Sequence, residues 1–436
     1  MPFRRTRWHS RLQAARWLTV LLALSSTACA PPDRGAPAAH RPDLAFGSAE
    51  EVGLSSQGLG LIRPAMQELV DAGRTAGVMT LVARDGKVVH WESAGWRVRG
   101  EDPLERTDIF RIYSMTKPVT SVAAMMLVED GLMSLDEPLA TYLPDFADAR
   151  VWDDGALRPP TRPITIRDLL RHTSGLTYGI FGNTPVDRMY IEALGGLSPY
   201  SGRSLEETVD LIATLPLVAD PGTLWNYSMS TDVLGRVIEV ASGLSLADFF
   251  RMRIFEPLGM KETGFSVVPA NADRLVSLYR LTSDGLAGGS GYEGDFTRRP
   301  SWYSGGGGLT STALDYLRFA QMLLQGGELD GVRLLREETV HEMTRSQLGD
   351  LGTISLSPTD GFGLGFAVSV TGPTPGIYWW VGVVNTWFWI DPVEGIVAFA
   401  WAQLDPLGGA GINPIMRRLV YQAVVDSRRA VPAGAP

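Results

Sequence analysis

The apolar positions of this chain predict strands near both ends and a helix-rich middle. Residues 77–98 alternate between apolar and polar positions around Asp85-Gly86, which is typical of a β-hairpin. Strand patterns return over residues 361–403, and residues 411–426 have the spacing of an amphipathic helix. Between about 107 and 345, helical and loop patterns rich in Gly and Pro dominate. The strands therefore lie at the two ends of the sequence.

This distribution predicts an α+β fold, in which strands from both termini form one antiparallel sheet with the terminal helices packed on it. We expect one domain over residues 49–428. Its sheet lobe would comprise residues 49–106 and 350–428, and its helical lobe residues 107–349. A functional site is expected between the lobes, and residues 429–436 are expected to form a disordered tail.

The N-terminus has the pattern of a secretory signal. Five arginines precede the short apolar run of residues 17–24, which is too short to span a bilayer and is followed by small residues. We predict a signal over residues 1–29 and a flexible linker over residues 30–48. Cleavage after Ala30 fits an A-x-A site. Alternatively, Cys29 is the lipidated cysteine of a bacterial lipoprotein, although Ser26 stands where such signals usually have leucine.

We favour lipidation, because Cys29 is the only cysteine and a Pro/Ala-rich stretch follows it. The expected location is then outside the cytoplasm, in the periplasm or anchored to a membrane through Cys29. Disulfides and thiolate metal sites are excluded after this position. The net charge of −9 becomes more negative when the arginines of the signal are removed, so nucleic-acid binding is not expected. No metal or organic cofactor is implied.

Ser114 and Lys117 form the strongest local signal for chemistry. The chain has only three lysines, and a lysine can lose its proton when burial penalises the ammonium, which an arginine cannot. Pro118 lacks an N–H and fits only the first turn of a helix, so the helix must begin near Ser114. Because residues i and i+3 share a helix face, Lys117 should lie beside the Ser114 hydroxyl and act as its general base.

Five segments resemble, in the same order, the serine β-lactamase-like superfamily, and most of all class C β-lactamase relatives and family VIII carboxylesterases. They span much of the chain between residues 54 and 424, at residues 107–133, 165–176, 221–243, 255–265 and 305–323. The resemblance implies that Ser114 is the acyl-accepting nucleophile and Lys117 its base partner. It also implies that Tyr227 shares the acid–base work, and that His172 is a structural histidine.

Two departures from the family pattern bear on the substrate. Met229 stands where the family often has an asparagine that holds an amide group. Trp380, Val381 and Gly382 occupy the place of the K-T-G motif and resemble the W-G-G form of family VIII esterases. The cation that would attract a penicillin carboxylate is therefore absent, which favours esters over β-lactams.

The same strand is expected to carry part of the oxyanion hole, formed by the N–H groups of Val383 and Ser114. Residues 176–204 contain aromatic side chains among glycines and prolines, and we expect them to form a loop wall or lid. The residues expected to line a pocket for an acyl chain or aromatic ester are Tyr178, Phe181, Met229, Tyr303 and Trp380 with Val381 and Gly382.

The sequence thus predicts a serine hydrolase that cleaves small carboxylic esters through an acyl-enzyme on Ser114. Lys117 and Tyr227 would share the general base and acid roles. A β-lactamase or a D-amino-acid peptidase or acyltransferase on the same fold is the alternative within this class. A non-catalytic lipoprotein that binds cell-wall fragments or lipids is the alternative from another class.

Overall fold

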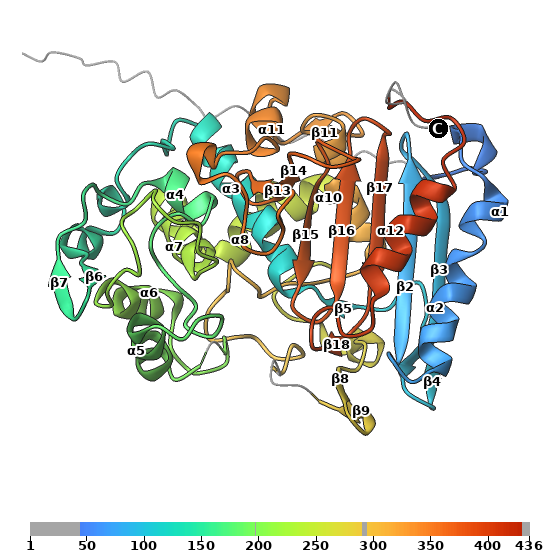
Figure 1. Cartoon of the computed structure of the whole chain (residues 1–436), viewed down its shortest axis with the longest axis horizontal. Coiled ribbons are helices and arrows are strands. Elements are labelled where there is room, and N and C mark those ends of the chain that lie inside the picture. Colours follow the sequence, from blue (N-terminus) through green and yellow to red (C-terminus); the bar gives the residue numbers. More distant parts are fainter. Residues whose placement is uncertain (1–43, 197, 290–293, 430–436) are drawn as a thin grey trace, which may run out of the picture. The chain divides into compact units, whose positions relative to one another are not determined.

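A mixed sheet between two layers of helices organises the part of the chain that is described, residues 44–196, 198–289 and 294–429 of a computed structural model (Figure 1). The strand order is β1-β3-β2-β17-β16-β15-β14-β13, with β4 paired to β3. These strands are β1 (Ala45–Phe46), β2 (Gly77–Arg84), β3 (Lys87–Val98), β4 (Asp102–Pro103), β13 (Asp360–Phe362), β14 (Ala367–Ser369), β15 (Tyr378–Gly382), β16 (Thr386–Asp391) and β17 (Ile396–Trp401).

The predicted α+β class is confirmed, since strands from both ends of the chain meet in this sheet. β2 pairs antiparallel with the C-terminal strand β17, and the hairpin β2–β3 turns at Asp85-Gly86. Both turn residues have positive φ, 51° and 79°, as a two-residue hairpin turn requires. One detail differs from the expectation. β1 lies within the predicted linker, residues 30–48, and pairs parallel with β3.

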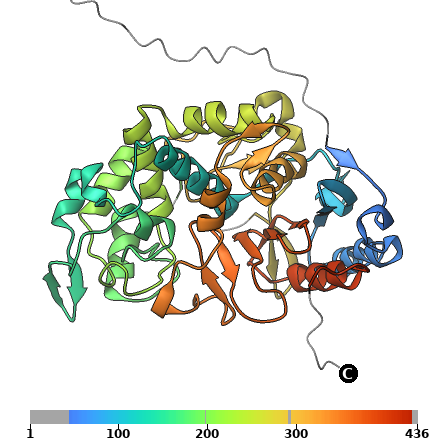
Figure 2. The same cartoon turned by 90° about the horizontal axis from the view of Figure 1, so that it is seen from above.

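The outer face of the sheet is covered by α1 (Ser56–Leu59), α2 (Ile62–Asp71) and α12 (Ile412–Gln422). Figure 2 shows α12, in red, beside the blue N-terminal helices. Met66 and Met416 belong to one buried cluster with Val78 of β2 and Ala398 of β17. The predicted C-terminal amphipathic helix therefore seals one face of the sheet.

The inner face packs against α10 (Ala313–Leu324), whose Tyr316 ring lies 5.2 Å from Phe388 of β16 and 5.8 Å from Phe399 of β17. α10 falls in the range expected to form the helical lobe, yet it belongs to the sheet's inner layer. Beside it runs α3 (Thr116–Glu129), in which residues 116–127 are all buried. A helix that is buried all round is a core element, and α3 carries the site into the middle of the molecule.

The remaining described elements form the second lobe and small hairpins. Figure 1 shows α4 to α7 in green on the side away from β2 and β3. These elements are α4 (Ile166–Leu170), α5 (Pro185–Leu194), α6 (Leu205–Ala213), α7 (Ser230–Ser242), α8 (Leu246–Phe250), α9 (Glu256–Leu258), α11 (Glu337–Met343), β5 (Phe110–Arg111), β6 (Val151–Asp153), β7 (Ala156–Arg158), β8 (Tyr279–Thr282), β9 (Gly285–Gly288), β10 (Thr310–Ser311), β11 (Glu328–Leu329), β12 (Val332–Arg333) and β18 (Leu404–Asp405).

The predicted signal, Cys29 and residues 430–436 of the predicted tail lie outside the described residues. The first residue of that tail, Arg429, is ordered, because its guanidinium pairs with the buried Asp391 carboxylate at 2.7 Å. Within the described ranges, no helix has both the length and the apolar character needed to cross a membrane. The same ranges contain no group of three or more His, Cys, Asp or Glu side chains arranged to hold a metal ion.

Candidate active site

Ser114 lies where the chain enters the buried helix α3. A 3-10 turn, Tyr113–Met115, precedes α3 directly, and Pro118 occupies the first turn of the helix, as the sequence predicts. Tyr113 has φ 41°, a left-handed conformation that non-glycine residues adopt only when their surroundings hold it. The Tyr316 hydroxyl donates to the Met115 carbonyl at 2.9 Å and helps to hold this turn. Ser114 is therefore presented on a fixed backbone.

Lys117 points inward at Ser114, and its side chain is only 1% exposed. Its Nζ donates to Ser114 Oγ at 3.3 Å, to the Tyr178 hydroxyl at 2.9 Å and to the Gly306 carbonyl at 2.7 Å. Three acceptors match the three hydrogens of an ammonium group. The predicted proximity of Lys117 to Ser114 is thus present. The sequence did not reveal the two further groups that hold the amine, Tyr178 and Gly306.

The two tyrosines of the site contact Lys117 in different ways. Nζ lies 4.6 Å from the centroid of the Tyr227 ring, so this tyrosine presents its face to the cation. The phenol oxygen that accepts a hydrogen bond from Nζ belongs instead to Tyr178. Burial raises the pKa of Tyr178 well above its ordinary value, and the charges of Asp232 and Tyr227 raise it further. Tyr178, predicted only as a pocket wall, is therefore a neutral phenol against the amine.

Asp232, near the start of α7, is a buried acid of the site that the sequence analysis missed. Its Oδ1 accepts hydrogen bonds from Ser304 Oγ at 2.6 Å and from the Gly306 N–H at 3.0 Å. Burial raises the pKa of Asp232, while Lys117 and these hydrogen bonds oppose the shift. The glycine run 305–308 was the sequence signal for this contact, because chains use glycine where backbone and side chains approach closely.

Helix α7 begins without a side-chain cap, although Ser230 and Thr231 stand at its start. Neither Ser230 nor Thr231 is the N-cap; that position is held by Met229, whose side chain cannot accept a hydrogen bond from the helix N–H groups. The buried hydroxyl of Ser230 instead joins that of Ser228 at 2.7 Å. Tyr227 therefore precedes the helix in a turn fixed by buried hydroxyl contacts.

His172 supports Tyr227 from behind. Its ring lies 4.9 Å from the Tyr227 ring and 5.5 Å from Phe362, and its backbone carbonyl accepts from the Asn226 N–H at 2.9 Å. Burial lowers the pKa of His172 well below its ordinary value, and the Lys117 charge lowers it further, so the imidazole is neutral. The residue has φ 57°, so its turn must be held by neighbouring contacts.

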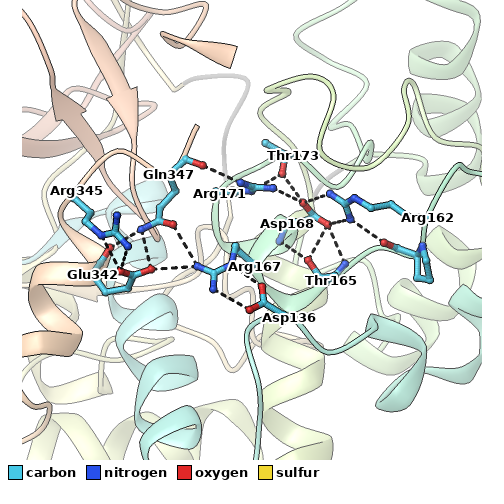
Figure 3. A network of polar contacts seen from close by, with 11 residues as sticks. Asp136, Arg162, Thr165, Arg167, Asp168, Arg171, Thr173, Glu342, Arg345 and Gln347 are labelled. Atoms are coloured by element: carbon cyan, nitrogen blue, oxygen red, sulfur yellow. Dashed lines mark hydrogen bonds and ion pairs between the residues drawn. The ribbon is translucent and has the colours of Figure 1, made fainter. Parts of the chain in front are cut away.

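A polar cluster around Asp168 of α4 holds that turn (Figure 3). The Asp168 carboxylate accepts from both terminal nitrogens of Arg162, at 2.6 and 2.9 Å, and from Arg171 at 3.1 Å. Thr165 and Thr173 each donate a hydroxyl to it at 2.8 Å. Figure 3 also shows that Arg167, Glu342 and Gln347 extend the cluster toward the segment before β13. The cluster fixes both ends of the turn that contains His172.

Replacing Asp168 with asparagine is expected to lower the free energy of unfolding by about 3 kcal/mol, because two arginines lose their buried partner. Burial raises the pKa of Asp168, but hydrogen bonds, above all from Arg162, outweigh it and bring the pKa to about 2. A carboxyl whose pKa is lowered by folding stabilises the fold above its ordinary pKa. The difference between wild type and variant should therefore shrink as the pH falls from about 4 toward 2.

Urea unfolding at several pH values measures this difference. Asp153→Asn, which alters an exposed pair with Arg158, is the matched control and should change stability little. A deficit for Asp168→Asn that stays constant from pH 6 to pH 2 would contradict the electrostatic explanation.

A cavity of about 300 Å³ opens beside these groups. Ser114, Tyr178, Tyr227 and Asp232 line it. Further lining residues are Tyr113, Ile180, Phe181, Gly196, Ser198, Pro199, Tyr200, Met229, Gly294, Phe296, Trp302, Ser304, Gly306, Gly307 and Val383. Most of these side chains are apolar or aromatic, and the Phe181 side chain at the cavity is 58% exposed. The cavity suits an uncharged organic group of modest size.

The predicted pocket residues divide into two groups. Tyr178, Phe181 and Met229 line the cavity, and so does Val383. The other four predicted residues are not among the described lining residues: Trp380, Val381, Gly382 and Tyr303.

Trp380 packs behind the site, with its ring 5.4 Å from Tyr227 and 5.2 Å from Phe362. The Tyr303 ring is engaged with Phe265 at 4.9 Å. A β-carbon at Gly382 would lie 2.5 Å from the Ile112 carbonyl, so glycine allows the strand to approach the chain just before Ser114. That approach brings Val383 to the same cavity as Ser114.

The segment predicted as a loop wall, residues 176–204, is partly helical. Thr184 and Asp187 form a capping box that starts α5, with Pro185 in its first turn. The cavity residues Tyr178, Ile180 and Phe181 lie on the chain just before this helix.

Comparisons with known proteins agree with this arrangement. A family model described as Beta-lactamase matches residues 62–421. Protein Rv1367c of Mycobacterium tuberculosis (strain ATCC 25618 / H37Rv) is 34% identical over 383 residues, which are 81% of this chain and 94% of that protein. Lovastatin esterase of Penicillium rubens is 32% identical over 359 residues, 74% of this chain and 87% of that protein.

Among solved structures, EstCE1, a hydrolase with promiscuous acyltransferase activity, superposes with a TM-score of 0.72 at 29% identity. The match covers 84% of this chain and 99% of that chain. The family predicted from the five motifs is therefore confirmed. The chain belongs to the beta-lactamase family, whose members similar to it include esterases and a hydrolase with acyltransferase activity.

Proposed function

We propose that this protein is a serine hydrolase that cleaves small carboxylic esters through an acyl-enzyme on Ser114. The observation that carries the proposal is the buried Lys117 amine, held 3.3 Å from Ser114 Oγ at the wall of an apolar cavity. An amine held beside a hydroxyl can activate that hydroxyl as a nucleophile. The esterase relatives support carboxylic esters as the substrate class.

In the proposed reaction, Ser114 Oγ attacks the ester carbonyl carbon while its proton passes to the Lys117–Tyr227 pair. The N–H groups of Ser114 and Val383 stabilise the oxyanion of the tetrahedral intermediate. The carbon–oxygen bond to the alcohol then breaks, and the pair returns the proton to the leaving alcohol. A water molecule, activated by the same pair, attacks the acyl-enzyme and releases the acid. Another alcohol in place of water would give acyl transfer.

The preference for esters over β-lactams rests on two side chains. Trp380 stands where a lysine could attract a carboxylate, and it packs against Tyr227 without a charge. Met229 lines the cavity where a family asparagine would hold an amide. A penicillin or cephalosporin entering this cavity would bury its carboxylate without a cation from these two positions, and burial of an unpaired charge is unfavourable.

Purified protein is therefore expected to turn over p-nitrophenyl butyrate with a kcat/KM at least about a hundredfold above that for nitrocefin, a difference of nearly 3 kcal/mol in transition-state stabilisation. Both substrates are followed by absorbance at one pH. Fast nitrocefin hydrolysis with negligible ester turnover would reverse the order and favour a β-lactamase.

A matched variant sharpens this comparison. Met229→Asn restores the family's amide-holding side chain and should raise the nitrocefin rate relative to the ester rate. Met229→Leu, which keeps an apolar side chain of similar size at the cavity wall, is the matched control. If Met229→Asn and Met229→Leu have the same ratio of rates, Met229 does not set the preference.

A further inference from the structure

Asp232 is buried at the active site, and the ester mechanism above assigns it no role. The residue is 1% exposed and lies at the wall of the cavity with Ser114. Its Oδ1 accepts from the Ser304 hydroxyl and from the Gly306 N–H. A carboxylate withdrawn from water to this extent is unfavourable unless other groups compensate for it. Two hydrogen bonds to one oxygen compensate only in part.

Gly306 connects Asp232 to Lys117. Its N–H donates to the Asp232 carboxylate at 3.0 Å, and its carbonyl accepts from Lys117 Nζ at 2.7 Å. A β-carbon at Gly306 would lie 2.4 Å from Asp232 Oδ2 and 2.8 Å from the Tyr178 hydroxyl. The acid, the glycine and the phenol are therefore in close contact, so we expect the position of Asp232 to constrain the Gly306 carbonyl that holds the amine.

The balance of buried charges at the site also connects Asp232 with Lys117. Lys117 is buried, and the hydrogen-bond partners of its Nζ among the described residues are a serine hydroxyl, a phenol and a backbone carbonyl, none of which is a carboxylate. The other titratable groups that face it are Tyr178, Tyr227 and His172, and burial keeps the Tyr178 phenol and the His172 imidazole neutral. The Lys117 charge favours the ionised form of Asp232, and Asp232 is the acid among the described residues that line this cavity.

We propose that Asp232 is a positioning residue for Lys117: it fixes the Gly306 peptide that holds the amine and supplies the negative charge that balances the ammonium. This inference rests on the proposed ester hydrolysis by Ser114 and Lys117, because its readout is that reaction. Asp232 touches no reacting atom and acts only through Lys117.

The pH dependence of kcat/KM separates this role from a merely structural one. Activity requires that the coupled Lys117–Tyr227 pair lose a proton, which sets the acid limb of the profile. A nearby negative charge disfavours that loss, whichever member of the pair gives up the proton. Removing the charge should therefore move the acid limb to lower pH, by about one pH unit.

The variant Asp232→Asn removes the charge but keeps an oxygen that can accept from Ser304 and Gly306. The variant Asp232→Ala removes both. Asp232→Asn is expected to shift the acid limb of p-nitrophenyl butyrate hydrolysis down by about one unit with little change in KM. Asp232→Ala is expected to show the same shift and a plateau kcat lower by about tenfold, because the Gly306 peptide is released.

Asp315→Asn is the matched control. Asp315 is also buried near a helix N-terminus with a pKa raised mainly by burial, but the groups around it are Glu262, Thr263 and the Lys261 backbone. This variant should keep the wild-type acid limb. The proposal is overturned if Asp232→Asn keeps the wild-type limb, or if Asp315→Asn shifts it equally.

If Asp232→Asn does not fold, Asp232→Ala provides the same test of the charge. Its acid limb should also move down by about one unit. An unchanged limb in that variant would overturn the proposal. Wild-type protein that shows no Ser114-dependent ester turnover would overturn the ester mechanism itself, whereas turnover with an unmoved limb would remove only the role of Asp232.

Discussion

Replacing Ser114 with alanine is expected to lower kcat/KM for p-nitrophenyl butyrate by about ten-thousand-fold or more, the range seen when a catalytic nucleophile is removed. The reason is structural. Ser114 is the hydroxyl next to the buried Lys117 amine, and a methyl group leaves the amine without a nucleophile to activate. Binding of the ester should persist, since the apolar walls of the cavity are unchanged.

Two measurements test this prediction together. Ester turnover is compared between wild type and Ser114→Ala, and a fluorophosphonate probe followed by peptide mass spectrometry identifies the labelled residue. Ser121→Ala, a buried serine farther along α3, is the matched control and should keep both turnover and labelling. A wild type that the probe does not label would instead support the non-catalytic binding lipoprotein.

The sheet was predictable because its signals are local. The hairpin β2–β3 combines two alternating strands with an Asp-Gly turn, and each of these features is contained in a short stretch of sequence. β1 was missed, since a strand of two residues has no periodicity to detect. α10 lies in the range predicted as the helical lobe and packs on the sheet, because an apolar face shows that a helix is buried but not which surface covers it.

The contact between Ser114 and Lys117 was also predictable from a local signal. Ser114 and Lys117 are three residues apart on one turn, so their contact could be derived from helix geometry and the position of Pro118. The other partners of Lys117 lie 61 and 189 residues farther along the chain, at Tyr178 and Gly306. Such contacts exist only after the lobes have folded together, and nothing in the sequence around Lys117 indicates them.

Trp380 illustrates a related difficulty. The alternation of β15 places every second side chain on the same face, so burial of this tryptophan was predictable. Whether that face opens onto the cavity or onto the core behind it depends on the loop that carries Tyr227 and on Phe362. These rings fill the space in front of Trp380, which therefore supports the tyrosine from behind rather than lining the cavity.

The two tyrosines at Lys117 are expected to differ strongly when each loses its hydroxyl. Tyr227→Phe should lower kcat for p-nitrophenyl butyrate by about a thousandfold, the loss typical of a general acid–base group, with little effect on KM. Tyr178→Phe removes one acceptor from Lys117 and should lower kcat by about tenfold. Burial raises the pKa of Tyr178 well above its ordinary value, and we expect its phenol to hold the amine rather than to take the Ser114 proton.

Each variant is the matched control of the other, because both remove one oxygen from a ring that contacts the same amine. Both rings also stay within the aromatic cluster around Lys117, where they lie 5.3 Å apart, so the packing should survive. Steady-state kinetics give kcat for the two variants, and thermal unfolding verifies that both remain folded. If kcat falls more for Tyr178→Phe than for Tyr227→Phe, Tyr178 rather than Tyr227 is the acid–base group. Its hydroxyl is the one that accepts a hydrogen bond from the Lys117 amine.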